Sequence, residues 1–394
     1  MLLPRSADVV VIGAGAVGAA CAYFAARAGL SVAVVDRGAI AGGTSSACEG
    51  NILVSDKEAG PELELAQYSQ SLWRGELADY GHLWEFESKG GLVVSATPST
   101  QANLERLAGR QREAGIDVEL VGGAELAGHE PHLAPGLAGG AHYPQDAQVQ
   151  PMLAAAHLLR LARGLGATVH PDTRVTGLGR RGDAVTSVTT SRGAISAGSV
   201  VNAAGTWGGA VAGLAGVNVP VLPRKGYVMV TEPLPDMVRH KVYAAEYVDN
   251  VASSDAGLQT SPVVEGTRGG TILIGSSRER VGFDKSINPR VLADMAGKAI
   301  ALFPFLAGAK ALRSYSGFRP YCPDHLPVIG PDPRAPGLWH ACGHEGAGIG
   351  LSVGTGALIA ASLASATPAM DMAPFAPERF DQLSLDSGTE AARA

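Results

Sequence analysis

The amino-acid sequence predicts an α/β protein with two interleaved domains, one on a parallel sheet flanked by helices and one α+β domain built on an antiparallel sheet. The 394 residues exceed the size that one hydrophobic core usually supports. A strand–helix–strand pattern opens the chain, and glycine-rich apolar sequence returns in its last third. Between about Pro220 and Leu312 the sequence is instead richer in strand patterns and charge.

The chain opens with a βαβ unit. Asp8–Ile12 is short, continuous and β-branched, which is typical of a buried strand. Ala16–Ala28 is rich in alanine and predicts a helix that Gly29 closes as its C-terminal cap. Leu30–Val35 predicts the next strand, which ends at Asp36. Two strands joined through a helix in this way are expected to be parallel.

The apolar run Val9–Ala26 is long enough to span a bilayer. It carries three glycines, it divides into a strand pattern and a helix pattern, and it lies inside the βαβ unit. We therefore expect neither a signal peptide nor an integral membrane segment.

The remaining elements follow from apolar periodicity and from glycine and proline punctuation. Helices are expected at Pro61–Tyr80, Ser99–Ala114 (capped by Ser99 or Thr100), Gln150–Gly164, Pro289–Phe303 and Ala347–Ala364. Strands are expected at Gly91–Ser95, Ala167–His170, Thr173–Leu178, Val185–Thr190, Gly193–Ser196, Ser199–Asn202, Lys225–Thr231, Thr271–Ser277 and Gly337–Cys342. We assign residues 1–85, 142–220 and 312–375 to a nucleotide-binding domain, 86–141 and 221–311 to a substrate-binding domain, and 376–394 to a polar tail expected to be disordered.

The first βα turn carries a dinucleotide fingerprint, Gly13-x-Gly15-x-x-Gly18. Gly13 permits the tight turn, Gly15 lets a pyrophosphate approach the backbone, and Gly18 lets the helix pack on the strand. Ala16 and Val17 open the helix, whose N–H groups and dipole favour phosphate. Asp36, 18 residues after Gly18, is placed to accept hydrogen bonds from ribose hydroxyls. The fingerprint predicts a Rossmann-like domain but does not separate FAD from NAD.

Three later loops favour FAD. Gly42–Ser46 (GGTSS) offers hydroxyls for a second phosphate, and Ala203–Trp207 (AAGTW) places small residues at the end of a strand. Gly343–Gly350 (GHEGAGIG) precedes an apolar helix, whose dipole would stabilise the negative charge of a reduced flavin. Read without context, these loops also fit a polar loop, a plain turn and a helix start with no ligand. A nicotinamide enzyme has no need of the last loop, so the set predicts an FAD-binding domain.

Composition excludes several other classes. The formal charge is −6, with no basic stripe and few aromatic residues, so we expect no nucleic-acid partner. The spacing of the four cysteines (Cys21, Cys48, Cys322 and Cys342) matches neither a zinc nor an iron–sulfur site. We therefore predict no metal site and an intracellular protein with reduced thiols.

Together these motifs resemble the D-amino-acid oxidase/glycine oxidase (DAO) family of FAD enzymes over roughly residues 7–366. The resemblance rests on the fingerprint, the Gly42–Ser46 loop, Asn202–Trp207, Phe318-Arg319-Pro320 with Pro327–Pro331, and His344–Gly350. Within the family, Thr44–Ile52 and His344–Gly350 are most similar to the β subunits of opine oxidase, hydrogen cyanide synthase and D-hydroxyproline dehydrogenase.

The resemblance implies oxidation of a C–N bond beside a carboxylate, with hydride transfer from the α-carbon to flavin N5 and hydrolysis of the imine. It implies that Arg319 binds the carboxylate as a bidentate pair. Tyr227, Tyr247 and Tyr321 are candidates to close the pocket, although packing is the commoner role of such tyrosines. His344 and Glu49 are candidates to lie by the flavin, the alternatives being a structural histidine and a contact with a partner subunit. The expected cofactor-binding residues are Gly13, Gly15, Ala16, Val17, Gly18, Asp36, Arg37, Gly43, Thr44, Ser45, Ser46, Gly50, Asn51, Val175, Ala203, Ala204, Gly205, Trp207, Gly343, His344, Glu345, Gly346, Ala347, Gly348 and Ile349.

Three hypotheses remain for the role of the chain and for the acceptor of its electrons. In the first, the chain is the catalytic β subunit of a multi-subunit amino-acid dehydrogenase, with partner flavoprotein or iron–sulfur subunits. In the second, it is a stand-alone oxidase that uses dioxygen. In the third, it is a non-catalytic flavin subunit for assembly or electron relay, and Arg319 counts against this because a relay needs no carboxylate ligand. The resemblance implies a cytoplasmic protein, peripheral at the inner membrane where partner subunits pass electrons on.

Overall fold

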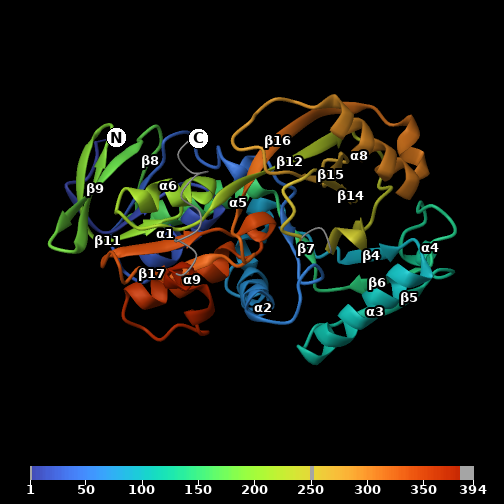
Figure 1. Ribbon diagram of the computed structural model, residues 1–394, viewed down its shortest axis with the longest axis horizontal. Helices are drawn as coiled ribbons and strands as arrows, with labels where there is room; N and C mark the ends of the chain where they lie inside the picture. Colours follow the sequence, from blue (N-terminus) through green and yellow to red (C-terminus); the bar gives the residue numbers. More distant parts are fainter. Residues whose placement is uncertain (1, 249–252, 382–394) are drawn as a thin grey trace.

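The computed structural model describes residues 2–248 and 253–381, and it divides them between two large sheets that lie side by side (Figure 1). The α/β class predicted from the sequence is confirmed. In the first sheet the strands β1, β2, β8, β11 and β18 run parallel, and in the second nearly all neighbours run antiparallel. A two-stranded ribbon of β3 (Asn51–Ile52) and β7 (Ala147–Gln148) lies apart from both.

The first sheet draws its strands from the start, the middle and the end of the chain. Its central strand β1 is continuous and β-branched, and its Val9–Ile12 segment is buried, as a strand covered on both faces should be. The order along the sheet is β17 (Val328–Pro331), β18 (Leu338–Cys342), β11 (Gly193–Asn202), β1 (Ser6–Ile12), β2 (Val32–Val35) and β8 (Thr168–His170), with β10 (Ala184–Thr190) and β9 (Val175–Arg181) extending from β11. Gly193–Asn202 is thus one continuous strand, where two separate strands were predicted.

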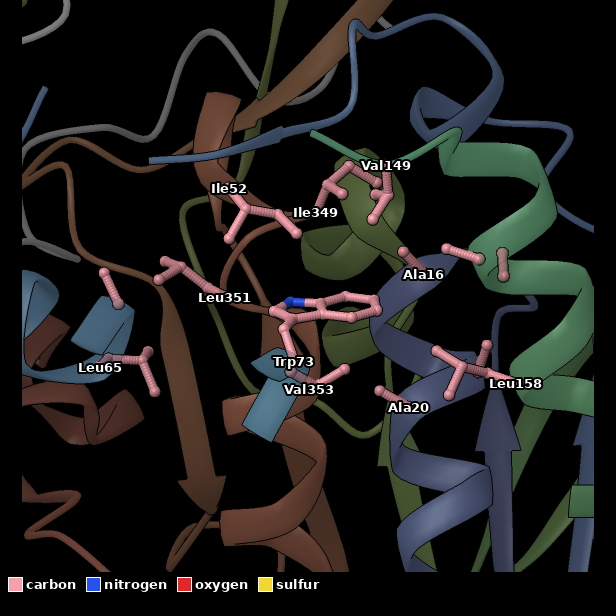
Figure 2. Close-up of a cluster of buried hydrophobic side chains, with 14 of the residues drawn as sticks. Ala16, Ala20, Ile52, Leu65, Trp73, Val149, Leu158, Ile349, Leu351 and Val353 are labelled. Carbon is pink, nitrogen blue, oxygen red and sulfur yellow. The ribbon is translucent and has the colours of Figure 1, made fainter. Parts of the chain in front are cut away.

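Three helices meet on one face of this sheet: α1 (Ala16–Arg27), α5 (Pro151–Gly164) and α9 (Ser352–Leu363). Helices α1 and α9 approach so closely that a Cβ on Gly356 would lie 2.6 Å from the Ala20 carbonyl carbon. The α2 helix (Pro61–Arg74) packs beside α9 and sends Trp73 into the cluster (Figure 2). The Trp73 ring lies among Ala16, Ala20, Leu158 and Val353, so one aromatic side chain packs against α1, α5 and α9. On the opposite face of the sheet, a second cluster includes residues of β10 and of α6 (Gly208–Gly213).

The second sheet carries the remaining helices. Its order is β16 (Ala311–Tyr321), β12 (Leu222–Thr231), β15 (Ile272–Arg278), β14 (Gln259–Gly266), β13 (Lys241–Ala244), β4 (Gly91–Ser95), β6 (Gly139–Tyr143) and β5 (Glu119–Gly122). The pair β13 and β4 is parallel and joins an antiparallel group of five strands to one of three. Helix α8 (Pro289–Leu302) covers β14 and β15, α3 (Pro98–Glu113) covers β4 and β6, and α4 (Leu126–His129) precedes β6. The domain boundaries drawn from the sequence stay a prediction.

Several predicted limits are corrected. Helix α2 ends at Arg74, because Gly75 follows as its C-cap, and the chain continues as a separate 3₁₀ helix, Ala78–Trp84. Helix α3 takes its N-terminal cap from Thr97, whose side chain accepts a hydrogen bond from the Thr100 N–H, so neither Ser99 nor Thr100 is the cap. Helix α9 begins at Ser352, five residues later than predicted, because the glycine-rich segment before it forms a loop with a 3₁₀ turn at Glu345–Ala347.

The beginning of the polar tail is also corrected. Residues 377–380 form a 3₁₀ helix in which Phe380 is buried, and Arg379 donates to Asp324 at 2.6 Å. One apolar side chain and one arginine thus hold this segment on the first domain. Residues 382–394 lie outside the described residues.

No helix in the described residues is long and apolar enough to cross a membrane. The apolar run at the start of the chain is divided between β1 and α1, as predicted.

Candidate active site

A cavity of about 590 Å³ lies beyond the carboxyl ends of β1, β2, β11 and β18 and extends to β12 and β16 of the second sheet. This is the edge at which ligands bind in open parallel sheets. Its volume lies within the range of roughly 300–1,000 Å³ that is typical of small-molecule and cofactor sites.

The fingerprint loop forms one wall. Gly13 has φ +115°, and a Cβ there would overlap the carbonyl oxygen of Ala203. A Cβ on Gly18 would overlap the carbonyl oxygen of Gly13, so Gly18 allows α1 to pack on the loop but does not itself line the cavity. Gly15, Ala16 and Val17 line it together with Gly13. The N-terminus of α1 therefore opens onto the cavity, where its N–H groups favour a phosphate.

Asp36 lines the cavity at the end of β2. Its carboxylate accepts backbone hydrogen bonds from the N–H of Ala14 (2.7 Å) and of Gly38 (2.8 Å), so the side chain also fixes the two loops around it. The guanidinium carbon of Arg37 lies 3.7 Å from the centre of the Trp207 ring. Thr173 and Arg174, which the sequence did not suggest, line this end beside Val175.

The loop after β11 and the hydroxyl-rich loop face each other across the cavity. Ser45 accepts a hydrogen bond of 3.0 Å from the N–H of Ala16, and Thr44 donates to the Phe318 carbonyl at 2.6 Å. Ser46 turns away and donates to the carbonyl of Gly43, so it does not line the cavity. The other predicted residues of these loops, Gly43, Gly50, Asn51, Ala203, Ala204, Gly205 and Trp207, do line it.

The second glycine-rich loop closes the far end. His344, Glu345, Gly346, Gly348 and Ile349 line the cavity, whereas Gly343 and Ala347 do not. Behind the loop, the indole Nε1 of Trp73 donates 3.1 Å to the carbonyl of Gly350, which ties it to the core.

His344 and Glu345 carry different charges in this loop. Burial lowers the pKa of His344 to about 3, so its ring is neutral near pH 7, and its Nε2 lies 2.9 Å from the Thr355 hydroxyl. Burial alone would raise the pKa of Glu345, but hydrogen bonds with His325 and Arg224 outweigh it and lower the pKa. Glu345 is therefore an anion that is fully engaged by the protein.

Arg319 lies on β16 and lines the cavity next to Gly346. Its Nη1 donates 2.8 Å to the carbonyl of Ser277. Its Nε and Nη2 donate no hydrogen bond to any described residue, so two nitrogen donors of the guanidinium are available to a ligand. Opposite it, a Cβ on Gly226 would lie 2.8 Å from the guanidinium carbon, which explains why the smallest residue is needed there.

The three candidate tyrosines occupy different places. Tyr247 follows β13, lines the cavity, and stacks under the guanidinium of Arg278 at 4.9 Å. Tyr321 is buried and does not line the cavity. The prediction that Tyr227 closes the pocket is wrong. Strand residues alternate between faces, so Gly226 and Val228 line the cavity while the Tyr227 hydroxyl donates to the carbonyl of Ser286 on the other face.

A buried ionic group that the sequence did not reveal lies beside the cavity. Glu49 lines the cavity although only 8% of its surface is exposed, and the Lys241 ammonium lies 3.3 Å from its Oε2. The same ammonium lies 3.3 Å from Glu265 and donates 2.6 Å to the Asn51 side chain. Burial lowers the pKa of Lys241, but Glu265 and Glu49 outweigh it and raise the pKa, so this lysine is charged. The family resemblance makes Glu49 a candidate, but no local pattern indicates a lysine 192 residues away.

Cys48, the cysteine next to Glu49, lines the cavity with a protonated thiol. Burial, with the nearby Glu49 carboxylate, raises the pKa of its thiol to about 12, so almost none of it is ionised near pH 7.

These residues fit FAD. Gly13 and Gly15 leave the backbone open at the N-terminus of α1, and a second glycine-rich loop faces the same cavity from β18. FAD bound there would place its phosphates at the first of these surfaces and its flavin ring at the second.

Comparison with known proteins agrees with this geometry. The family model described as FAD dependent oxidoreductase (DAO) matches residues 8–362. A glycine oxidase of Geobacillus kaustophilus is 31% identical over 94% of this chain and 97% of its own length. Subunit HcnC of the hydrogen cyanide synthase of Pseudomonas aeruginosa is 28% identical over 95% of this chain and 97% of its own length.

Solved structures share the fold. The crystal structure of glycine oxidase from Geobacillus kaustophilus superposes with a TM-score of 0.86 at 27% identity, covering 95% of this chain and 99% of that one. The crystal structure of L-proline dehydrogenase from P. horikoshii superposes with a TM-score of 0.88, covering 96% of this chain and 99% of that one. At 23% identity, the latter speaks for the fold alone.

Proposed function

We propose a reaction for this chain from one premise: the chain belongs to the DAO family of FAD-dependent oxidoreductases. FAD is therefore its cofactor, and the chain is an enzyme. We propose that it oxidises the C–N bond of an amino acid at the carbon that carries the carboxylate. The observation that carries this proposal is Arg319, a cavity-lining arginine with two donors of its guanidinium fork left over.

The cofactor contacts are proposed from the cavity wall. The N–H groups at the start of α1 and the Ser45 hydroxyl would hold the pyrophosphate, and Asp36 would accept from the ribose. The loop His344–Ile349 would lie along the flavin ring. FAD bound there supplies a two-electron acceptor, at N5, for the hydride of the substrate α-carbon.

Arg319 positions the substrate. A guanidinium binds a carboxylate through two parallel hydrogen bonds, which fixes orientation as well as distance. The bond from Nη1 to the Ser277 carbonyl holds the side chain in place, so Nε and Nη2 need little reorganisation to receive the carboxylate. Holding the reacting carbon in one geometry is the main contribution that this protein makes to the rate.

The amine and the product are handled without a dedicated acid–base pair. The substrate amine must be neutral to lose a hydride, and His344 is neutral and faces Thr355. Loss of the hydride from the α-carbon turns the C–N bond into an iminium, which water then hydrolyses to the 2-oxo acid and to ammonia or an amine. Tyr247 would close the substrate end of the cavity, because it lines this end and is held by the Arg278 guanidinium.

The substrate is proposed to be a D-amino acid, a proline- or hydroxyproline-like imino acid or an opine. The 28% identity to HcnC, a synthase subunit, supports a catalytic β subunit whose electrons pass to partner subunits. The 31% identity to a glycine oxidase supports the alternative, a stand-alone oxidase that reduces dioxygen.

The test of the carboxylate role is Arg319→Met in the FAD-loaded enzyme. Anaerobic bleaching of the flavin by a panel of glycine, sarcosine, D-amino acids, proline and hydroxyproline isomers and opines identifies the substrate first. With that substrate, the variant should lose about 100-fold or more in the second-order rate of bleaching, since a charge-assisted pair contributes about 3 kcal/mol. The flavin content should not change.

Arg313→Met is the matched control, because Arg313 lies on the same strand and is exposed. If Arg319→Met bleaches as fast as the wild type, the carboxylate assignment is wrong. If no compound of the panel bleaches the wild-type flavin, the proposed substrate classes are wrong. Oxygen uptake compared with dye reduction by the purified chain separates the two acceptors, since only a stand-alone oxidase turns over well with oxygen alone.

A further inference from the structure

Three histidines meet at one place in the second sheet, away from the flavin cavity. His129 ends α4, His142 lies in β6, and His240 directly precedes β13. Their ring centres are 5.0, 5.2 and 6.0 Å apart, and one nitrogen of each lies within 4.8 Å of the others. None of the three lines the flavin cavity.

Two of these rings are oriented by carboxylates. Nδ1 of His142 lies 3.0 Å from Glu119, and Nδ1 of His240 lies 2.9 Å from Glu130. Glu130 is fully buried and also accepts from the backbone N–H groups of Arg239 and His240, so it is itself fixed. A carboxylate beside Nδ1 keeps the proton of the imidazole on Nδ1, which leaves the lone pair of Nε2 available to bind a metal. This arrangement is the usual second layer of histidine metal sites.

The free edges of these two rings face the same small space. A Cβ built on Gly90 would lie 3.0 Å from Nε2 of His142 and 3.3 Å from Cδ2 of His240, the carbon next to its Nε2. Gly90 has φ +77°, a conformation that favours glycine, and it thereby keeps side-chain atoms out of this space. The side chains of His142 and His240 are 15% and 16% exposed, so an ion can reach them from solvent.

We propose that His129, His142 and His240 form a binding site for a divalent transition-metal ion, with Zn²⁺ as the preferred ion. Imidazole nitrogen suits Zn²⁺, Cu²⁺ and Ni²⁺, and three histidines leave one tetrahedral position for water. The ligand nitrogens lie within 4.8 Å of one another. Zn–N bonds of about 2.0–2.1 Å in a tetrahedral site place them roughly 3.3 Å apart, so only small side-chain movements are needed. The ion would join α4 and β6, which are close in the sequence, to the start of β13, about a hundred residues later.

The test uses the full-length, FAD-loaded enzyme, stripped with a chelator and passed through a desalting column. Titration with Zn²⁺ against a chromophoric competitor should give one ion per chain with a dissociation constant in the micromolar range or below. His142→Ala and His129→Ala should each weaken binding at least 100-fold. Co²⁺ should give the visible absorption of a tetrahedral nitrogen site in the wild type alone.

Two further variants separate this site from adventitious binding. Glu119→Gln, at a largely exposed residue, should weaken Zn²⁺ binding by roughly 10-fold, as loss of an outer carboxylate does. His82→Ala, at an exposed histidine of the 3₁₀ helix Ala78–Trp84, should not change it.

Flavin content and melting temperature without zinc show whether each variant is folded. If His142→Ala disrupts β6, His129→Ala, which changes a residue on a short helix, is the variant expected to remain folded. The proposal is overturned if the wild type takes up less than about a tenth of an equivalent of Zn²⁺ in the micromolar range. It is equally overturned if folded His129→Ala binds zinc like the wild type.

Discussion

The guanidinium of Arg224 donates a hydrogen bond of 2.6 Å from Nη1 to Oε1 of Glu345. Arg224 belongs to the second sheet, on β12, whereas Glu345 belongs to the glycine-rich loop that follows β18 of the first sheet. The second oxygen of Glu345 faces Nδ1 of His325 at 3.1 Å. One buried ion pair thus holds the loop beside the proposed flavin ring against the sheet that carries Arg319.

Arg224→Met should lower the free energy of unfolding by about 3 kcal/mol, because the largely buried Glu345 carboxylate loses its arginine partner. Denaturant unfolding of the FAD-loaded enzyme measures this, and the loss should be accompanied by weaker FAD retention. Arg110→Met is the matched control. Its pair with Glu58 is half exposed, so its loss should change stability by less than about 1 kcal/mol. Equal effects of the two substitutions would contradict a structural role for the buried pair.

Asp36→Ala should weaken FAD binding by about 10-fold or more, because hydrogen bonds to a charged acceptor contribute roughly 1.5–3 kcal/mol. Flavin fluorescence during titration of the deflavinated protein measures the dissociation constant. Asp8→Ala should bind FAD normally, because the Asp8 carboxylate lies in β1 and accepts its hydrogen bonds from Ser31. A purified Asp36→Ala variant with full flavin content and wild-type affinity would remove the ribose assignment.

The pH dependence of catalysis should not come from His344. Burial lowers the pKa of this ring to about 3, so it does not change charge near neutrality. The rate kcat/KM should instead rise with pH as the substrate ammonium loses its proton. His344→Gln should lower the rate but leave the apparent pKa of the profile unchanged. A profile whose acid limb moves or disappears in the variant would show that His344 titrates in catalysis.

The buried carboxyl of Asp146 predicts that stability falls as the pH rises from about 4 to about 7. Burial raises its pKa in the folded protein to about 7, against 3.8 in an unfolded chain, although hydrogen bonds from Ser55 and Val54 oppose the rise. The folded state therefore binds the proton more tightly. Its contribution to stability is full below about pH 4 and is lost as the pH rises through about 7.

Between pH 6 and pH 8 this group alone should lower the free energy of unfolding by about 1 kcal/mol. Asp146→Asn should reduce the difference between the two pH values, as measured by denaturant unfolding. Part of the difference should remain, because burial also raises the pKa of Glu62 to about 7. Asp117→Asn, at an exposed acid, is the control and should leave the difference unchanged. A full difference in Asp146→Asn would contradict the assignment.

Local patterns were enough to predict the βαβ unit and much of the cavity wall. The glycines of the fingerprint are dictated by backbone conformation and by close approach, both of which act within a few residues. Arg319 and Tyr247, which line the cavity, came from the family resemblance rather than from spacing.

The face of a buried strand could not be predicted in the same way. Val228 and Tyr227 are both buried in β12, so no alternation of polar and apolar residues indicates which one faces the cavity. The family resemblance suggested Tyr227, and the strand places its neighbours there instead.

Contacts between segments that are distant in the sequence could not be predicted either. The Lys241 ammonium pairs with Glu49, which lies 192 residues away in the sequence. The three clustered histidines come from positions 129, 142 and 240. Such pairs are set by strand order and not by spacing along the chain. The same limit explains why disorder was wrongly expected from residue 376 onward. Phe380 is buried in a cluster formed by other parts of the fold, which its neighbours in the sequence do not indicate.

The interleaving of the first sheet determines the order in which the protein can be completed during synthesis. Strand β1 pairs with β11 at Ser6–Ser196, and β11 in turn pairs with β18 at Val200–Leu338. A ribosome-bound chain that has reached β11 still lacks β18 and the helix α9 that packs on α1. At synthesis rates of roughly 5–20 residues per second, β11 waits several seconds or longer for β18, and α1 waits longer still for α9. The amino-terminal half therefore exposes apolar surface until the last third emerges, and FAD has no complete site to enter before then.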